Sequence, residues 1–507
     1  MRITRVTFWA TFCILILGVP TAHAQQPEPQ QPQQQEEQPQ RPVPAYRSPL
    51  ASAADNGDED DLDAGPQKLV PDNRSLSGAQ VLSLGELATT HNYWQPHVDI
   101  NVTADSDGLS QTNTTGWTSW SSVFGGIDLH HISGTSNLSL FYSGGVSISN
   151  DGSSNNEVVQ SLEFMEKLTY RRAAFSIVDQ LSYLPEAAFG FQNAGVGIGI
   201  VPGTGSIGLQ SGFQPQESIL TAQGQRISNS FVPEMDVYLT GRSSLTFVGS
   251  YSLLHFFDND LLDFQSGGVQ AGYNYQMTRK DTIGFIYHFT AIRYTGFNQS
   301  INDNVFQLSY GRRITGKLAF QIGAGPEITS FATPIMGSGT TGMGGTGTGG
   351  TGTMMPSSST TDLYWSLNSS LRYQLRRTGL GVTYNHGVTG GSGVQAGSVT
   401  DTVNGNVSRQ LSRRFNGLCS VGYSRNNGLT VGTPALPTAT QTQTYDYWTV
   451  NASLNHPMGR TMNMSLIYNL QYQNSNSAFC VGPTCATSLT RHQITLSFGW
   501  HDTPIPF

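Results

Sequence analysis

The sequence predicts an all-β fold, a transmembrane antiparallel β-barrel of about 18 strands, with 16 strands as the alternative. Two patterns lead to this prediction: apolar and polar residues alternate in many short segments, and the connections between segments alternate between short and long. The composition is a third observation, because only 12% of the 507 residues are charged and only 37% are hydrophobic. Soluble proteins carry roughly 25% charged residues. The composition therefore favours strands with one polar and one lipid-facing side over a packed soluble domain.

The first 24 residues predict a cleaved secretory signal peptide. Arg2 and Arg5 precede the apolar run 14–19, and Ala22-His23-Ala24 has the small residues of a cleavage site. No later stretch approaches the roughly 20 apolar residues that a transmembrane helix requires. An exported chain of this kind is either soluble or a β-barrel.

Residues 25–75 predict a disordered tether. The segment is first rich in Gln and Pro and then acidic ("DNGDEDDLD"), so it has too little apolar surface to fold. Residues 25–95 contain eleven Asp and Glu against four Lys and Arg, and they account for most of the formal net charge of −8. Residues 76–95 regain some apolar character and predict a short segment in the periplasm or in a barrel lumen. The barrel itself is expected over residues 96–507.

Alternation is clearest in residues 460–474, where large apolar residues such as Met462, Leu466 and Tyr472 occupy even positions and mostly polar residues occupy odd positions. The apolar side would face either a protein core or lipid. We expect it to face lipid, because only a closed barrel leaves no unpaired backbone of a sheet in hydrocarbon. Eighteen segments show such patterns at about the length of a tilted membrane-spanning strand. They are 97–103, 119–131, 136–147, 157–171, 172–184, 230–240, 243–256, 264–277, 281–294, 303–313, 316–330, 360–376, 378–388, 400–412, 414–426, 443–456, 460–474 and 490–500.

The connections between these segments assign the two ends of the barrel. Short connections are rich in basic residues, as in "TYRRAA", "MTRKDT" and "LRRTG", whereas the long ones include 185–229, 331–359 and 475–489. Transmembrane barrels have short periplasmic turns and longer outer loops. We therefore expect the tight turns, the N-terminal tether and the C-terminus to lie in the periplasm.

Over about residues 96–507 these features resemble the porin-type β-barrels of bacterial outer membranes. The resemblance implies an outer-membrane location in contact with lipid, insertion by the barrel-assembly machinery, and passive diffusion of small hydrophilic solutes. It is compatible with a homo-oligomer and implies neither a cofactor nor a nucleic-acid partner. Phe507 is similar to the C-terminal aromatic residue by which such barrels are recognised, although it is out of register with the even-numbered outward residues of 490–500.

Polar residues on the inward side of the predicted strands are candidates for lining a pore. They are Arg372, Asn368, Asn451 and Asn469. An inward Arg would attract anions in an open pore, or it would pair with polar groups in a filled lumen. The sequence leaves both interpretations of Arg372 open.

The connection 185–229 resembles, in place and length, the third loop that narrows the lumen of many porins. Its charged residues Glu186, Glu217 and Arg226 are candidates for a constriction. The alternative is an outer loop or hairpin above the rim. Cys480 and Cys485 lie in another predicted outer loop, where an exported protein would form a local disulfide.

Nothing in the sequence predicts catalysis or a metal site. The histidines are scattered over different segments, and the Gly-rich stretches 195–199 and 342–353 lack the Lys and the strand-to-helix setting of a phosphate-binding loop. We therefore expect a channel and no enzyme. The alternative function is a structural, secretion-associated or surface-adhesion barrel with a blocked lumen.

Overall fold

The structure is a computed structural model. It describes residues 92–106, 117–150, 156–184, 225–257, 262–295, 299–333, 358–375, 377–390, 397–412, 414–429, 443–476 and 488–506. The predicted signal peptide and tether lie outside these residues, as do Phe507 and the cysteines of the predicted disulfide. Of the segment 76–95, the structure describes only residues 92–95, and it assigns residues 93–95 to the first strand.

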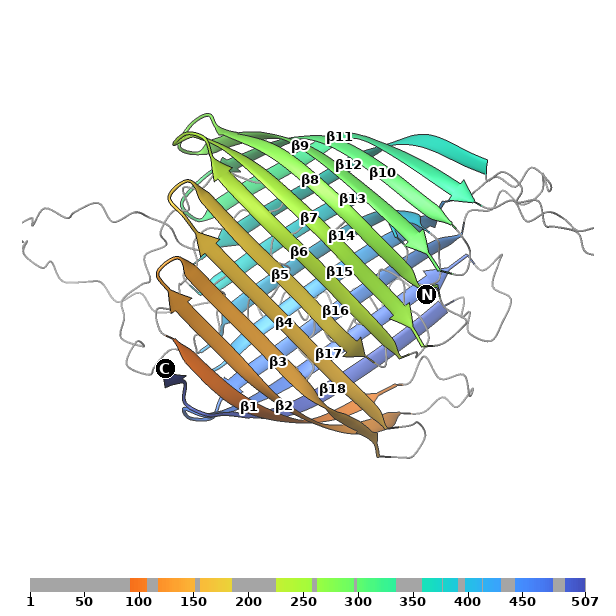
Figure 1. Ribbon diagram of the computed structural model, residues 1–507. Helices are drawn as coiled ribbons and strands as arrows, with labels where there is room; N and C mark the ends of the chain where they lie inside the picture. Colours follow the sequence, from red (N-terminus) through yellow and green to blue (C-terminus); the bar gives the residue numbers. More distant parts are fainter. Residues whose placement is uncertain are drawn as a thin grey trace, which may run out of the picture. The chain divides into compact units, whose positions relative to one another are not determined.

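Eighteen long antiparallel strands close into a barrel, so the expected count of 18 is confirmed (Figure 1). Each predicted segment coincides with one strand, with ends that differ by a few residues. The strands are β1 (Tyr93–Asp105), β2 (Thr118–Ser133), β3 (Ser136–Ser149), β4 (Glu157–Thr169), β5 (Ala173–Leu184), β6 (Arg226–Tyr238), β7 (Ser243–Phe256), β8 (Phe264–Gln276), β9 (Asp281–Tyr294), β10 (Ser300–Arg313), β11 (Leu318–Thr333), β12 (Ser358–Gln374), β13 (Thr378–Thr389), β14 (Ser398–Gln410), β15 (Asn416–Gly428), β16 (Thr444–Pro457), β17 (Met462–Ser475), β18 (Ser488–His501) and the two-residue β19 (Ile505–Pro506).

Each of the 18 long strands pairs with the next one in sequence, and β1 closes the barrel against β18. The closing register runs from His97 opposite His501 to Asp105 opposite Gln493. The short β19 continues this pairing at the start of β1. A closed ladder pairs the backbone polar groups of neighbouring strands around the whole barrel, which is the condition for crossing a bilayer with strands.

The described residues contain no helix that is long and apolar enough to span a membrane.

The outer face of the barrel is apolar, as the alternation predicts. In β17, the outward residues Met462 and Leu466 are 44% and 48% exposed, whereas the inward Asn469 and Gln471 are 1% and 2% exposed. The same division holds in β18, where Phe498 faces outward. The apolar side of residues 460–474 therefore points away from the interior of the barrel.

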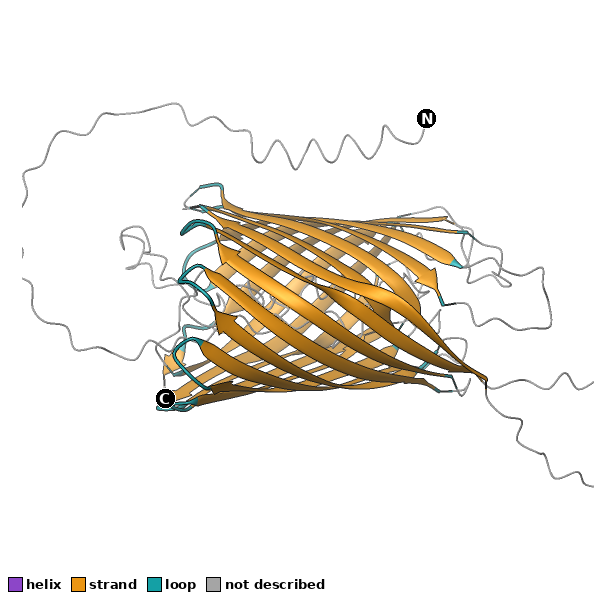
Figure 2. Cartoon of the chain, turned by 90° about the horizontal axis from the view of Figure 1, so that it is seen from above, coloured by secondary structure: helices purple, strands orange, loops and turns teal. Residues whose placement is uncertain are grey.

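Short turns lie together at one end of the barrel, where they are coloured teal in Figure 2. They connect the strand pairs β2–β3, β4–β5, β6–β7, β8–β9, β10–β11, β12–β13, β14–β15 and β16–β17. Two of them contain a glycine with positive φ, Gly134 at 43° and Gly459 at 102°, a backbone conformation that suits glycine. β1 begins at this end and β18 finishes there, as the predicted topology requires.

Candidate functional site: the lumen

The inner wall is built largely from amide, hydroxyl and glycine residues, because the inward positions of each strand alternate with the apolar outer ones. Asn451 and Asn469 face each other across β16 and β17 and are 5% and 1% exposed. The amide of Asn451 donates to Thr449 Oγ1 at 3.3 Å, and that of Asn469 donates to Gln493 Oε1 at 3.1 Å. Both residues thus lie on the lumen side, where the sequence placed them.

Asn368 and Arg372 also lie on the inward side of β12, since the intervening Leu371 is 41% exposed on the outer face. The Asn368 amide donates to Gln307 Oε1 at 2.9 Å, and the Gln307 amide donates to Ser366 Oγ at 2.8 Å. Arg372 is opposite Ala319 of β11 and Gly381 of β13. The structure does not bring Arg372 together with the Asn451–Asn469 pair.

The predicted constriction loop needs one correction. Arg226 is the first residue of β6, so the preceding connection ends at residue 225 and not at 229. Its side chain is 1% exposed, and its guanidinium carbon lies 5.1 Å from the centre of the Phe256 ring. Arg226 therefore belongs to the barrel wall. Glu186 and Glu217 lie outside the described residues.

The inward charges of the described strands are predominantly acidic. Ten carboxylate residues occupy inward positions: Asp99, Asp105, Asp128, Glu157, Glu163, Glu234, Asp236, Asp303, Glu327 and Asp362. Five Lys and Arg residues do so: Lys167, Arg226, Arg313, Arg372 and Arg491. Arg372 was among the predicted pore-lining residues and these carboxylates were not, although their places in the alternation are visible in the sequence.

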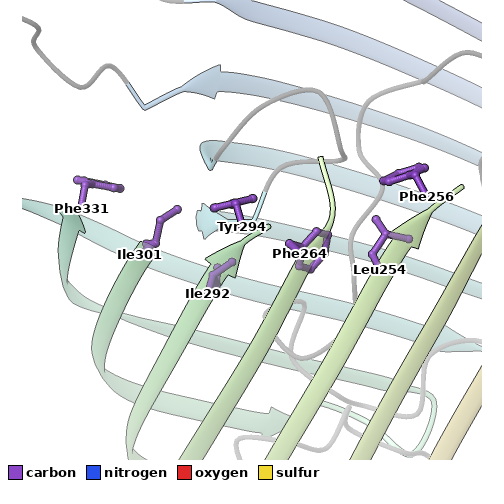
Figure 3. Packing of buried hydrophobic residues seen from close by; sticks show 7 residues of the cluster. All are labelled: Leu254, Phe256, Phe264, Ile292, Tyr294, Ile301 and Phe331. Atoms are coloured by element: carbon purple, nitrogen blue, oxygen red, sulfur yellow. The ribbon is translucent and has the colours of Figure 1, made fainter. Parts of the chain in front are cut away.

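An apolar cluster interrupts the polar inner wall near the ends of β7–β11 that are opposite the tight turns. Figure 3 shows its seven side chains, Leu254, Phe256, Phe264, Ile292, Tyr294, Ile301 and Phe331. Leu262, Tyr364, Val388 and Leu429 pack against it. Val388 comes from the end of β13 and Leu429 directly follows β15, so chain at the ends of β13 and β15 covers this part of the wall.

The contact with this cluster separates the end of β13 from β12. The register between the two strands ends at Leu367 opposite His386, whereas β12 remains paired with β11 up to Ser358. Beyond that point, the Val388 amide donates to Glu327 Oε1 at 2.8 Å, and the Tyr294 hydroxyl donates to the Gly390 carbonyl. The end of β13 therefore leaves the ladder and is held by side chains of β9 and β11.

A cavity lies next to the end of β13, on the lumen side of β9–β14. Its polar lining includes Asp303, Gln307, Glu327, Asn368 and Asn385. Asp303 and Glu327 are 5% and 1% exposed. No group of three or more His, Cys, Asp or Glu side chains in the described part of the chain could hold a metal ion.

The joint between β1 and β18 carries a buried ion pair on its lumen side. Arg491 Nε lies 3.1 Å and 2.9 Å from the two carboxylate oxygens of Asp105, and Arg491 Nη2 donates to Asp105 Oδ2. The Gln493 amide donates to the same carboxylate at 3.0 Å. Near the tight turns, the Gln95 amide lies 2.8 Å from His501 Nδ1 and donates to the Asp502 carbonyl at 2.6 Å.

No protein-family model matches the sequence, and no curated protein matches it. Among solved structures, OpdK of Pseudomonas aeruginosa is similar, at 10% identity and a TM-score of 0.37 over 81% of this chain and 99% of OpdK. OpdQ of the same organism gives 9% identity and a TM-score of 0.39 over 82% and 98% of the two chains. OccAB3 of Acinetobacter baumannii gives 7% and 0.39 over 81% and 99%. The strand pairing of this chain itself shows the architecture of a porin-type barrel: closed, antiparallel and 18-stranded.

Proposed function

We propose that the protein is an outer-membrane channel for passive diffusion of small hydrophilic solutes. The observation that carries this proposal is the division of side chains on a closed barrel, with apolar residues outside and polar residues inside. A barrel of about this strand number is wide enough for an aqueous path. The solute would follow the polar inner wall from one rim to the other.

Outward-facing tyrosines near both rims support a position in a bilayer. Near the tight turns, Tyr310 donates to Asp281 Oδ1 at 2.9 Å. Near the opposite rim, Tyr423 donates to Asp446 Oδ1 at 2.8 Å. Aromatic rings with a polar end gather at membrane–water interfaces, so these pairs fit the two edges of a lipid-facing band. The signal peptide, the periplasmic tether, assembly by the barrel machinery and a homo-oligomer remain predictions.

The acidic excess of the inner wall favours cations over anions in such a channel. One similar structure is OccK2 of Pseudomonas aeruginosa in complex with glucuronate, and another is OpdK with vanillate. For this chain we expect small polar solutes, and the inward carboxylates support a preference for those that carry positive charge.

A barrel with a closed lumen is the second candidate, and one observation favours it. Several inward amides are almost completely buried, among them Asn101 and Asn274 at 0% and Asn469 at 1% exposed. Amide side chains on the wall of a wide water-filled pore would be more exposed. A lumen that is closed at rest would suit a structural, secretion-associated or adhesion role.

Conductance in a planar bilayer separates the two candidates. The full-length protein is compared with a variant that lacks residues 25–91, a deletion that ends before β1. Steps of current in both proteins would support the channel. Current only after the deletion would support the closed barrel. Silence of both proteins, after folding is shown by heat-dependent mobility in gels, would overturn the channel proposal.

A further inference from the structure

The cavity on the lumen side of β9–β14 has an unusual set of polar groups. Its lining includes the carboxyl groups of Asp303 and Glu327 and the side-chain amides of Gln307, Asn368 and Asn385, with His288 beside them. None of the described residues that line it is Lys or Arg. The cavity therefore offers two carboxyl groups and several amide oxygens as hydrogen-bond acceptors, with no fixed positive charge from its described lining.

The two carboxyl groups are only partly satisfied by their neighbours. Asp303 Oδ1 accepts the Thr329 hydroxyl at 2.7 Å, and Glu327 Oε1 accepts the Val388 amide at 2.8 Å. Glu327 Oε2 is buried, and no N–H or hydroxyl group of the described residues donates to it. The carboxyl groups of Asp303 and Glu327 lie within hydrogen-bonding reach of each other, so one of them can hold a proton that both share. Buried neighbouring carboxylates are unfavourable unless a proton or a cation compensates them.

Gly387 leaves space beside this oxygen. A Cβ atom at that position would lie 3.3 Å from Glu327 Oε2 and 3.5 Å from Oε1. The absence of a side chain at Gly387 thus keeps one side of the carboxylate open. The cavity measures about 60 Å³ by the positions that the centre of a water-sized molecule can occupy. This is several times the 10–15 Å³ that one water requires, so the cavity has room for the end group of a solute.

We propose that this cavity binds the primary ammonium group of a small polar solute in the lumen. An ammonium group has three N–H donors and one positive charge. It can donate to Glu327 Oε2, to Asp303 and to an amide oxygen of the wall, and it compensates the negative charge that remains on the carboxyl pair when the two groups share one proton. The site would select amines from the solutes that the proposed channel admits, and in this sense it rests on the proposed function.

Calorimetric titration of the detergent-folded full-length protein tests the site without requiring conductance. The probe is putrescine, with 1,4-butanediol as the uncharged analogue and succinate as the anionic one. We expect putrescine alone to bind. Charge-assisted hydrogen bonds are stronger than neutral ones, so Glu327→Gln should weaken binding about tenfold or more. Absence of putrescine binding, or equal binding of butanediol, would overturn the proposal.

Two further variants separate a specific site from general attraction to an acidic lumen. Gly387→Ala keeps every charge but fills the space beside Glu327 Oε2, so it should also weaken binding. Glu163→Gln removes an inward carboxylate of β4 that is outside the cavity lining, so it should leave binding within twofold. An effect of Glu163→Gln as large as that of Glu327→Gln would contradict the site. A channel that conducts yet binds no putrescine would refute the site alone, whereas binding without conductance would refute only the channel.

Discussion

Two boundaries between neighbouring long strands have the shortest registers in this barrel, β1 with β18 and β12 with β13, but side chains support them differently. The first joins strands about 400 residues apart in sequence, and side chains reinforce it at both ends of its register. The second joins strands linked by the short turn 375–377, and its ladder ends at Leu367 and His386 although β12 continues. Side chains thus supplement the closing joint, and a local hairpin joint is left incomplete.

The difference follows from chain entropy. A tight turn keeps β12 and β13 together at low entropic cost, so the pair tolerates the loss of its last ladder bonds. No turn holds β1 and β18, so their association depends on direct contacts. The end of β13 also gains other contacts, with Glu327, Tyr294 and the apolar cluster, in exchange for the ladder. Side chains therefore supplement the short ladder of the closing joint, and the incomplete joint shapes the lumen.

The largest expected effect is at the closing joint. Arg491→Ala would leave Asp105 buried without its guanidinium, and such changes cost about 3–5 kcal/mol. Urea titration in lipid vesicles, followed by tryptophan fluorescence, would measure the loss of unfolding free energy. Arg414→Ala, in an exposed tight turn, is the control and should change it by less than about 0.5 kcal/mol. Equal effects of the two substitutions would show that the ion pair does not hold the joint.

A smaller effect is expected near the tight turns. Gln95→Ala removes the amide that contacts His501 and the Asp502 carbonyl. Two hydrogen bonds of this kind contribute about 1–2 kcal/mol together. The same titration should place this variant between wild type and Arg491→Ala. A loss as large as that of Arg491→Ala would mean that this end of the joint, and not the ion pair, dominates closure.

The smallest effect is expected at the boundary between β12 and β13, where cross-linking of cysteine pairs can show at which residues the ladder ends. Cysteines at Asn368 and Asn385 replace direct partners on the inward face, whereas cysteines at Tyr364 and Thr389 occupy inward positions further along the two strands, well beyond the end of the register. With the native cysteines replaced by serine, oxidation should cross-link the first pair efficiently and the second pair poorly, because a disulfide needs closely apposed Cα atoms. Equal yields would show that the ladder continues past His386.

The strand count, the strand order and the inward side of Asn368, Arg372, Asn451 and Asn469 could be predicted from sequence. Alternation with period two and turn chemistry are local properties, so they are visible without tertiary information. The start of β6 was missed because its alternation is broken by Asn229. This residue faces outward, and its amide donates to Asp179 Oδ1 of the neighbouring strand at 2.8 Å.

The cavity could not be predicted, for a physical reason. Asp303 and Glu327 are 24 residues apart in sequence, and they meet only through the register of β10 with β11. The end of β13 separates from β12 and brings the Val388 amide to Glu327. This separation depends on tertiary contacts, so no local sequence pattern predicts it. The apolar inner cluster was also unpredictable, because β9 carries apolar residues on both faces, such as Phe285 outside and Ile292 inside.

The proposed function requires that solutes cross through the polar lumen. The most direct test is single-channel current during modification of a cysteine at Asn451, on the inner wall, with a water-soluble thiosulfonate reagent. The neighbouring Ala452 faces outward, so Ala452→Cys is the matched control. If solutes pass along this wall, modification should cause a step change in current for Asn451→Cys and none for Ala452→Cys. Current that is unchanged by modification of Asn451→Cys, with labelling verified by mass, would contradict a path along this wall.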